Sequence, residues 1–446
     1  MLRCDFPSFL LSLALAGASL NAQTPVSELK ALTILHSNDL HARLVPNDED
    51  IGGFARIATL VRQQKANCKA CLYLNAGDMV QGTPVSPIFR GTPVYRVANL
   101  IGLDAGTLGN HEFDYGWRRA KEFARIAKFP VVSANIVDAS GKSITGRPYV
   151  IKTVDGIRVA IIGVTLSDLS GKFVTAGQVG PHKVLPVVET VRKYAAELRN
   201  QSDIIVVLGH IHDKEEVEVI LKEVPDVAVV VAGHTHEGYP QMMNVDGRVA
   251  VLVNSYGREL GRLDLKLDTA ARKVRSAEWT KIPLDSKIPL DPKVQAAAKS
   301  WEDKVSKIVD KPLGQATRRM TRAELRPLIE KSMRDKTGAD IAWINDGNVR
   351  DVLPQGIILE RHVWNILPFD NALVTGKFKG SQLPKTITDR YPVEPDKEYT
   401  VTTVDFTMLN QSADDQLNAT GLDFPVAGPL QRDTFIEWVK KQKSLP

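Results

Sequence analysis

Short apolar runs recur along the N-terminal part of the chain, and each gives way to polar residues. Runs rich in Val, Ile, Leu and Ala are typical of buried strands, and helical patterns such as Phe54–Lys65 separate several of them. The expected strands are Ala31–His36, Leu72–Ala76, Ala105–Leu108, Val131–Ile136, Val159–Val164, Ile204–Leu208, Val227–Ala232, Val249–Asn254 and Leu263–Leu267. Strands that alternate with helices predict an α/β layered domain over residues 30–282.

The pattern changes beyond this domain. A stretch rich in Pro and Lys opens residues 283–311 and predicts a linker, which an amphipathic helix follows at Lys293–Val309. Residues 312–446 predict a smaller α/β C-terminal domain, with a helix at Arg322–Lys336 and a strand at Ala339–Ile344. Two domains agree with the length of 446 residues, which exceeds the usual size of a single domain.

Residues 1–22 have the pattern of a secretory signal peptide. Arg3 precedes an apolar run from Phe9 to Leu20, and small residues follow that run. The run is too short to span a bilayer comfortably, and no later stretch of the sequence is apolar for long enough. We therefore expect an exported protein, periplasmic or extracellular, with no integral membrane segment after the signal is removed.

Composition narrows the class of protein. Hydrophobic residues make up 43% and charged residues 24% of the chain, as in an ordinary soluble globular protein. The net charge of +5 is small for this length and no dense Lys/Arg tract occurs, so we expect no nucleic acid as a partner. Cys68 and Cys71 lack the second cysteine pair of a zinc finger, which predicts a small surface disulfide in an oxidising compartment.

Polar residues with metal-binding chemistry follow five of the expected strands. Each of these strand ends also has a simpler explanation, either a turn or a surface histidine. For Gly109–Gly116 the simpler explanation is the start of a helix, with Asn110 as its cap and Glu112 capping or packing. The residues concerned are Asp39, His41, Asp78, Asn110, His111, His210, His234 and His236. Five of these are histidines in a chain that has nine, a concentration that packing does not explain. Ligands of open α/β sheets bind at the carboxyl ends of strands, so we expect one shared site.

The expected ligands combine nitrogen and oxygen donors and include no thiolate. Such donors suit Mn²⁺, Zn²⁺, Fe or Co rather than a structural cysteine–zinc site. The ligands are Asp39, His41, Asp78, Asn110, His210, His234 and His236, too many for one tetrahedral ion. They suit two divalent ions about 3.5–4 Å apart, an arrangement used for displacement at phosphorus. Asp78 is the expected bridge, because its neighbour Gly77 allows a close approach.

These motifs resemble those of a known family. The series Asp39-x-His41, Gly77-Asp78, Gly109–Glu112, Gly209-His210 and Gly233–His236 is similar to that of the calcineurin-like metallophosphoesterases. The wider segments Ile34–His41, Gly109–Gly116 and Ser255–Gly261 resemble the exported 5′-nucleotidase family, and Gly338–Ala342, Asn345–Arg350 and Leu367–Asn371 resemble its C-terminal domain. The resemblance implies a metallophosphoesterase sandwich of two sheets flanked by helices, followed by a smaller substrate-binding domain.

The resemblance also implies roles for individual residues. One ion would be held by Asp39, His41, Asp78 and His236, and the other by Asp78, Asn110, His210 and His234. A hydroxide activated by the ions would attack phosphorus, and His111, held by Asp114, would stabilise the charge that develops. In the second domain Arg350 would pair with phosphate, Asn345 would hydrogen-bond the substrate and Phe369 would stack on a base. Without the resemblance, Phe369 is expected to be a core aromatic.

Three segments depart from the family pattern, and the first is Leu325–Lys331, which stands where the family has a Gly-Asn-Leu-x-x-Asp-Ala helix start. Asn345–Arg350 lacks the family's three consecutive glycines, and Phe406–Asp415 stands where the family has a stacking Phe and a Gly-Gly-Asp-Gly loop. We expect a metal-dependent phosphoric ester hydrolase, with nucleoside 5′-monophosphates or related nucleotides as the first hypothesis for its small-molecule substrate. The alternatives are a nucleotide-sugar or cyclic-nucleotide hydrolase, a thiosulfohydrolase-like enzyme with the same metal site, and a non-catalytic binding protein.

Overall fold

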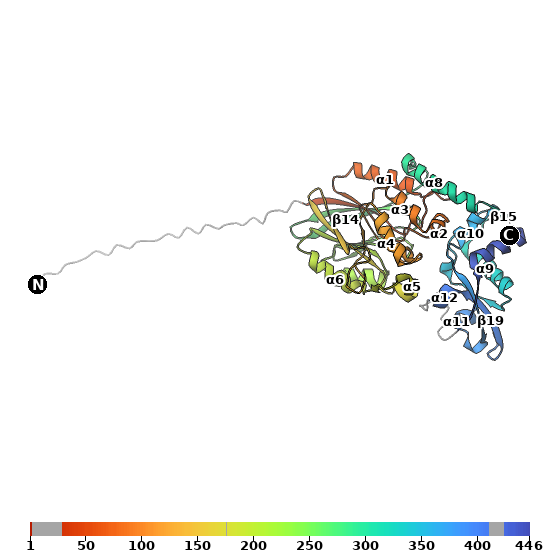
Figure 1. Cartoon of the computed structure of the whole chain (residues 1–446). Helices are drawn as coiled ribbons and strands as arrows, with labels where there is room; N and C mark the ends of the chain where they lie inside the picture. The colour runs from red at the N-terminus through yellow and green to blue at the C-terminus, as the bar shows by residue number, and fades with distance from the viewer. Residues whose placement is uncertain (2–28, 175, 410–422) are drawn as a thin grey trace.

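The computed structural model describes Met1 and residues 29–174, 176–409 and 423–446 (Figure 1). The signal peptide predicted at residues 1–22 lies outside the described residues, as do residues 410–415 of the late loop. Among the described helices, none combines the length and the apolar character of a membrane span. A larger N-terminal body and a smaller C-terminal body lie side by side, and the helix α8 (Pro292–Val309) runs from the first toward the second.

Two six-stranded sheets form the centre of the N-terminal body over the described residues. In spatial order, the first consists of β14 (Lys273–Pro283), β13 (Glu259–Asp268), β1 (Lys30–Ser37), β2 (Cys71–Asn75), β3 (Ala105–Thr107) and β4 (Val131–Val132). The second consists of β11 (Met243–Val245), β12 (Arg248–Val251), β10 (Val229–Gly233), β9 (Ile204–His210), β7 (Ile157–Thr165) and β6 (Tyr149–Val154). Strands β1 to β4 are parallel, as are β7, β9, β10 and β12.

Both faces of the central strands are buried. In β1, Leu32 and Ile34 lie in the core between the sheets, whereas Leu35 packs against helices. In β9, Val206 lies between the sheets and Val207 packs against helices on the outer face. Successive side chains of a strand point to opposite faces, so a strand buried on both sides must be apolar throughout. This geometry explains the near-continuous apolar runs in the sequence.

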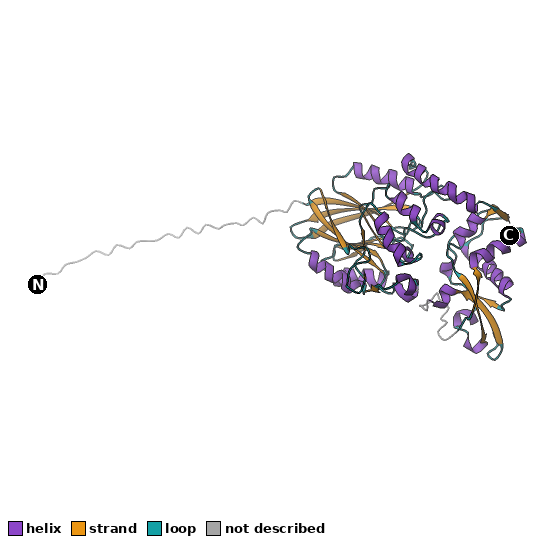
Figure 2. Cartoon of the chain, in the orientation of Figure 1, coloured by secondary structure: helices purple, strands orange, loops and turns teal. Residues whose placement is uncertain are grey.

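Helices cover the outer face of each sheet. The first sheet shares one apolar cluster with α1 (Phe54–Ala66), α2 (Val85–Phe89), α3 (Thr92–Ala98), α4 (Trp117–Ile126) and α8. The second packs against α6 (Val187–Leu198) and α7 (Glu218–Glu223), and α5 (Ala176–Val179), β5 (Ile136–Val137) and β8 (Lys183–Val184) complete this body. The layering confirms the predicted sandwich of two sheets flanked by helices (Figure 2).

Helix α8, which the sequence joins to the linker, packs on the N-terminal body. It begins after Asp291, whose side chain accepts a hydrogen bond from the Val294 N–H at 2.9 Å. Val294 and Val305 belong to the apolar cluster that contains α1. The division of the chain into domains at residues 282 and 312 stays a prediction.

The C-terminal body has the predicted smaller α/β fold. Its strands form the sheets β17 (Gly356–Leu359)–β15 (Pro312–Ala316)–β21 (Ser444–Leu445) and β16 (Ile341–Ala342)–β19 (Glu398–Val404)–β18 (Ala372–Lys379)–β20 (Val426–Leu430). Its helices are α9 (Arg322–Thr337), α10 (Glu360–Ile366), α11 (Lys385–Thr388), α12 (Asp405–Leu409) and α13 (Gln431–Gln442). A capping box between Thr321 and Glu324 starts α9.

Three expected strands are clearly shorter than the apolar pattern predicts, and one of them is Val249–Asn254, which ends as a strand at Val251. The run Val131–Ile136 divides into β4 and β5, which lie in different sheets. The chain turns between them because the Ser133 N–H donates to the Arg147 carbonyl at 2.9 Å rather than to a neighbouring strand. The run Ala339–Ile344 forms a strand only at β16.

The expected disulfide is present. Cys68 and Cys71 are bonded, with Cα atoms 5.9 Å apart. The bond closes the turn between α1 and β2, the strand that leads to Asp78.

Candidate metal centre

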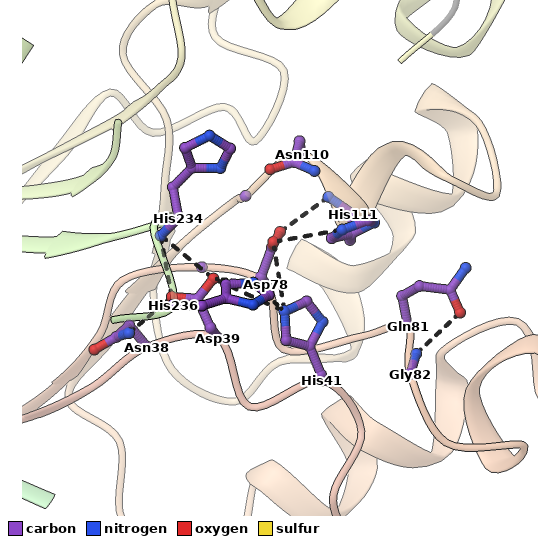
Figure 3. A network of polar contacts seen from close by, with 12 residues as sticks. Asn38, Asp39, His41, Asp78, Gln81, Gly82, Asn110, His111, His234 and His236 are labelled. Atoms are coloured by element: carbon purple, nitrogen blue, oxygen red, sulfur yellow. Dashed lines mark hydrogen bonds and ion pairs between the residues drawn. The ribbon is translucent and has the colours of Figure 1, made fainter. Parts of the chain in front are cut away.

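The carboxyl ends of five parallel strands meet at one edge of the sandwich, and the predicted ligands follow these ends. Strand β1 leads to Asp39 and His41, β2 to Asp78, β3 to Asn110 and β10 to His234 and His236, while β9 ends in His210. Figure 3 shows most of these side chains converging from separate strands. The structure brings all the predicted ligands to one place.

Four of the ligands form a compact group. The ligand atoms of Asp39, His41, Asp78 and His236 lie within 4.8 Å of one another. The Nε2 atoms of His41 and His236 are 2.9 Å apart, and Nε2 of His236 lies 3.4 Å from Oδ1 of Asp39. His236 is partly exposed and the other three are buried, so water screens the charges in this group weakly.

The remaining ligands surround His210. Its Nε2 atom lies 3.0 Å from Oδ1 of Asn110 and 3.2 Å from Oδ2 of Asp78. Its Nδ1 atom lies 2.9 Å from the Ala76 carbonyl, and this hydrogen bond turns Nε2 toward the cluster. The His234 ring packs edge-on against the His210 ring, with 5.2 Å between the centroids. Asn110 makes no capping hydrogen bond to the turn that follows it, so its amide faces His210 instead.

Asp78 lies between the two groups. Its Oδ2 atom is 3.2 Å from Nε2 of His210 and 3.9 Å from Nε2 of His41. Two glycines make room for the loops here: a Cβ on Gly109 would lie 2.6 Å from the Asp78 nitrogen, and one on Gly77 would lie 2.7 Å from the Gly109 nitrogen. Only glycine fits at these two positions.

Burial sets the protonation of the cluster. It lowers the pKa of His41 well below its ordinary value and that of His236 to about 2, so both rings are neutral and offer a lone pair. Burial also raises the pKa of Asp39 to about 6. Burial alone would raise the pKa of Asp78 as well, but the neighbouring His210 holds it well below its usual range.

These residues fit a divalent metal ion. The neutral rings of His41 and His236 direct their Nε2 atoms at each other beside two carboxylates. Within the described part of the chain, the buried Nδ1 atom of His41 has no hydrogen-bond partner. Imidazole and carboxylate donors without a thiolate suit Mn²⁺, Zn²⁺, Fe or Co. A cation held by these residues would bind the free lone pairs and would offset the repulsion between the carboxylates.

The ligand loops have an uncommon backbone conformation. The φ angle is positive at Asp39 (49°), His41 (45°), Asp78 (49°), His234 (93°) and His236 (66°). A left-handed conformation costs about 1–2 kcal/mol at a residue other than glycine. Hydrogen bonds between the loops hold it: the N–H groups of Asp39 and His41 donate to the carbonyls of Gly77 and Asp78, each at 3.0 Å.

Glu112 supports the cluster without belonging to it. Its buried carboxylate accepts hydrogen bonds from the N–H groups of Gly109 (2.6 Å), Met79 (2.9 Å) and Asp78 (3.1 Å). Burial raises its pKa to about 7, and the charge of Asp78 adds to this rise. The sequence indicated only capping or packing for Glu112, because two of these partners lie 33 and 34 residues away and no local pattern marks them.

His111 and Asp114 are in contact beside the cluster, on the 3₁₀ turn His111–Phe113 and the residue that follows it. Nδ1 of His111 lies 2.8 Å from Oδ2 of Asp114, and Nε2 of Gln81 donates to the same oxygen at 2.9 Å. Nε2 of His111 lies 3.9 Å from Oδ2 of Asp78. The imidazole therefore has one nitrogen held by Asp114 and the other close to the expected metal ligands.

A cavity of about 860 Å³ joins the cluster to the C-terminal body. Its lining includes His111 and His236 on one side and the three predicted substrate residues, Asn345, Arg350 and Phe369, on the other. The half-buried Phe369 ring stacks on His111 with 5.7 Å between centroids and 21° between planes. The Arg350 guanidinium lies 5.8 Å from the centroid of Phe369. Phe369 thus borders the cavity and is not a core aromatic.

Positive charge is available in this cavity. Arg258, Arg322 and Arg350 line it, and none of them has a carboxylate partner among the described residues. Asp346, on the same lining, is paired with Arg326. Guanidinium groups without a carboxylate partner can bind an anion such as phosphate.

Two families match successive parts of the chain. Residues 32–238 match the calcineurin-like phosphoesterases, and residues 304–391 match the C-terminal domain of the 5′-nucleotidases. The first match contains every predicted metal ligand, and the second contains Asn345, Arg350 and Phe369.

Individual relatives cover most of the chain. A 5′-nucleotidase from Bos taurus is 30% identical over 421 residues, which span 81% of this chain and 72% of the bovine protein. The endonuclease YhcR from Bacillus subtilis (strain 168) is 29% identical over 503 residues, covering 94% of this chain but 40% of that protein. The crystal structure of a 5′-nucleotidase precursor from Thermus thermophilus superposes on this chain with a TM-score of 0.83 and 24% sequence identity. The superposition covers 94% of this chain and 97% of that one, so the two proteins share a fold.

Proposed function

Because the chain belongs to the 5′-nucleotidase family and is a metal-dependent phosphoric ester hydrolase, we propose that it hydrolyses nucleoside 5′-monophosphates or related nucleotides with two divalent ions. The cavity carries this proposal: the metal-ligand cluster lines one side, and Arg350 and Phe369 line the other. A phosphate paired with Arg350 would lie between the two sides, and the ring of Phe369 would be available to a base.

We assign the ligands to two ions that share Asp78. Asp39, His41, Asp78 and His236 would hold one, and Asp78, Asn110, His210 and His234 the other. The position of Asp78 between His41 and His210 supports this division. When bound, such ions supply Lewis acidity toward phosphoryl oxygens and lower the pKa of water. The donor set admits Mn²⁺, Zn²⁺, Co²⁺ or Fe.

His111 serves as a hydrogen-bond donor to the reacting phosphate. Asp114 accepts from Nδ1 and sets the ring orientation, so a protonated His111 presents Nε2–H beside the cluster. A donor at this position stabilises negative charge on the phosphoryl oxygens or on the leaving oxygen. Gln81 helps to keep the Asp114 carboxylate in place, because its Nε2 donates a hydrogen bond to the same oxygen that contacts His111.

The C-terminal wall binds the rest of the substrate. Arg350 pairs with the phosphate, and Phe369 stacks on the base. Asn345 hydrogen-bonds the substrate: it is 7% exposed, and its buried Oδ1 has no partner in the described residues. In this assignment residues 30–282 carry the chemistry and residues 312–446 the recognition.

We also propose that the protein is exported to the periplasm or to the outside of the cell. The signal pattern of residues 1–22 supports export. The Cys68–Cys71 disulfide supports it as well, since disulfides persist in oxidising compartments.

A hydrolase with another substrate is the second candidate, and one observation favours it. Asp346 and Asn348 add side chains to the cavity wall where the family pattern has glycine. A nucleotide sugar, a cyclic nucleotide or a thiosulfonate would then use the same metal site.

Phosphate release by the mature protein tests the proposal, with Mn²⁺, Co²⁺ or Zn²⁺ added and with chelator as the control. The substrates are AMP, a nucleotide sugar, a cyclic nucleotide and an aryl phosphate. Metal-dependent preference for AMP supports the proposal. Turnover of the aryl phosphate alone rejects the nucleotide specificity, and no turnover with any of the metals overturns the proposal as a whole.

A further inference from the structure

Asn348 lies in the cavity lining with an amide that is not hydrogen-bonded. The residue is 2% exposed, yet neither Oδ1 nor Nδ2 has a partner in the part of the chain that the structure describes. An unpaired buried polar group costs about 1–3 kcal/mol. Buried polar groups in native proteins are nearly always paired, so this exception requires an explanation.

The backbone places Asn348 two residues before Arg350, the residue proposed to pair with phosphate. Asn348 ends the 3₁₀ turn Asp346–Asn348, and its N–H donates to the Asn345 carbonyl at 3.1 Å. Two residues later, the Arg350 N–H donates to the Ile366 carbonyl at 2.9 Å. Asn348 and Arg350 therefore lie on one short, anchored segment of the cavity lining.

The chemistry of a carboxamide indicates which part of a substrate it meets. It offers N–H donors and a carbonyl acceptor. A phosphate dianion offers only hydrogen-bond acceptors, so it would leave Oδ1 of Asn348 unpaired. The negative charge of the phosphate is already assigned to Arg350. A group that both donates and accepts, such as a sugar hydroxyl or the edge of a base, pairs with both halves of the amide.

We propose that Asn348 is a specificity-determining residue whose carboxamide hydrogen-bonds a donor–acceptor group in the uncharged, nucleoside part of the substrate. This inference rests on the proposed nucleotide hydrolysis. Asn345, which directly precedes this turn, also lines the cavity and has a buried Oδ1 without a partner among the described residues. Two such amides select a polar substrate over one that carries only phosphate and hydrocarbon.

The test replaces the amide with an apolar group of similar shape, Asn348→Leu. We expect kcat/KM for AMP relative to an aryl phosphate to fall about five- to tenfold, the effect of one lost hydrogen bond. The Tm should stay the same or rise, because the unpaired amide is gone. A residue with a purely structural role would lower the Tm and affect both substrates alike. Asn348→Ala repeats the measurement of the ratio with a smaller side chain.

Asn365→Leu is the matched control. Its Oδ1 is likewise buried and unpartnered among the described residues, but Asn365 lies on α10 and does not line the cavity. This variant should keep the ratio of AMP to aryl phosphate.

Ribose 5-phosphate separates the two sources of a donor–acceptor group. If Asn348→Leu weakens turnover of ribose 5-phosphate as much as that of AMP, the contact is to the sugar; a loss with AMP alone assigns it to the base. An unchanged AMP ratio, while the unaltered protein hydrolyses AMP, overturns this inference only. Failure of the unaltered protein to hydrolyse any nucleotide overturns the proposed function together with the inference.

Discussion

The metal-ligand cluster and the cavity wall opposite it differ in how far their polar groups are satisfied. In the cluster, the buried His210 contacts Asp78, Asn110 and a backbone carbonyl, and the exception within the described part of the chain is Nδ1 of His41, which has no partner. In the wall, Asn345 and Asn348 are similarly buried, but Oδ1 of Asn345 and both amide atoms of Asn348 lack partners among the described residues. Paired groups keep one geometry, whereas unpaired ones gain free energy only when a ligand arrives. If the proposed function is right, most of the reaction site is therefore built in advance, and the substrate completes the recognition site.

This difference follows from the elements that carry each region. The cluster lies on loops that leave parallel strands of two buried sheets, and these loops are hydrogen-bonded to one another. The wall residues lie on a three-residue turn that follows the two-residue strand β16. Loops fixed at both ends suit groups that must be placed accurately, and a short turn can change its side chains without disturbing a sheet.

Asp78→Ala should break the cluster side of this comparison and have the largest effect. It removes the carboxylate that lies between the two groups of ligands. We expect both ions to be lost and kcat to fall by at least about a thousandfold, because a metal supplies several kcal/mol of charge stabilisation. Metal content of the dialysed protein and phosphate release measure the result. Asp346→Ala, in the wall, should retain both ions, and two ions bound to Asp78→Ala would contradict the bridging role.

Glu112→Gln should show how far the cluster depends on a residue that binds no metal. The glutamine nitrogen cannot accept, so an N–H group of Gly109, Met79 or Asp78 loses its partner. We expect metal affinity or kcat to fall about 10- to 100-fold, as for other supporting residues of metal sites. Titration calorimetry with the metal measures the affinity.

Glu330→Gln is the matched control for this change. Glu330 is 2% exposed and lies in the C-terminal body, where both of its carboxylate oxygens accept from Arg390 at 3.0 Å. This variant should lower the Tm and leave metal affinity unaltered. If Glu112→Gln also binds metal as the unaltered protein does, the supporting role is wrong.

Phe369→Ala should act chiefly on KM and have the smallest of these three effects, although its ring also stacks on His111. We expect KM for AMP to rise about tenfold, the value of one aromatic stacking contact. KM for ribose 5-phosphate, which has no ring to stack, should change little, and metal content should be unaltered. An equal rise in KM for both substrates would show that Phe369 does not contact a base.

The convergence of the expected ligands could be predicted from the sequence because each follows an apolar run, and parallel strands bring their carboxyl ends to one edge. The length of strand β4, which begins at Val131, could not be predicted, since it depends on a hydrogen bond from the Ser133 N–H to the Arg147 carbonyl. The support from Glu112 depends on amides more than thirty residues away. The unpaired amide of Asn348 could not be predicted either, because it depends on which hydrogen-bond partners the fold leaves out of reach, and the sequence alone does not give this.

The left-handed backbone at Asp39, His41 and Asp78 has a consequence for protein engineering. If these side chains were copied onto the strand ends of another protein, its loops would relax to negative φ and turn each Cβ away. The conformation persists here because neighbouring loops bond to one another and because glycine at positions 77 and 109 lets them touch. The smallest portable unit of this metal centre is therefore the whole sheet edge with its loops, and a list of ligands does not suffice to transplant it.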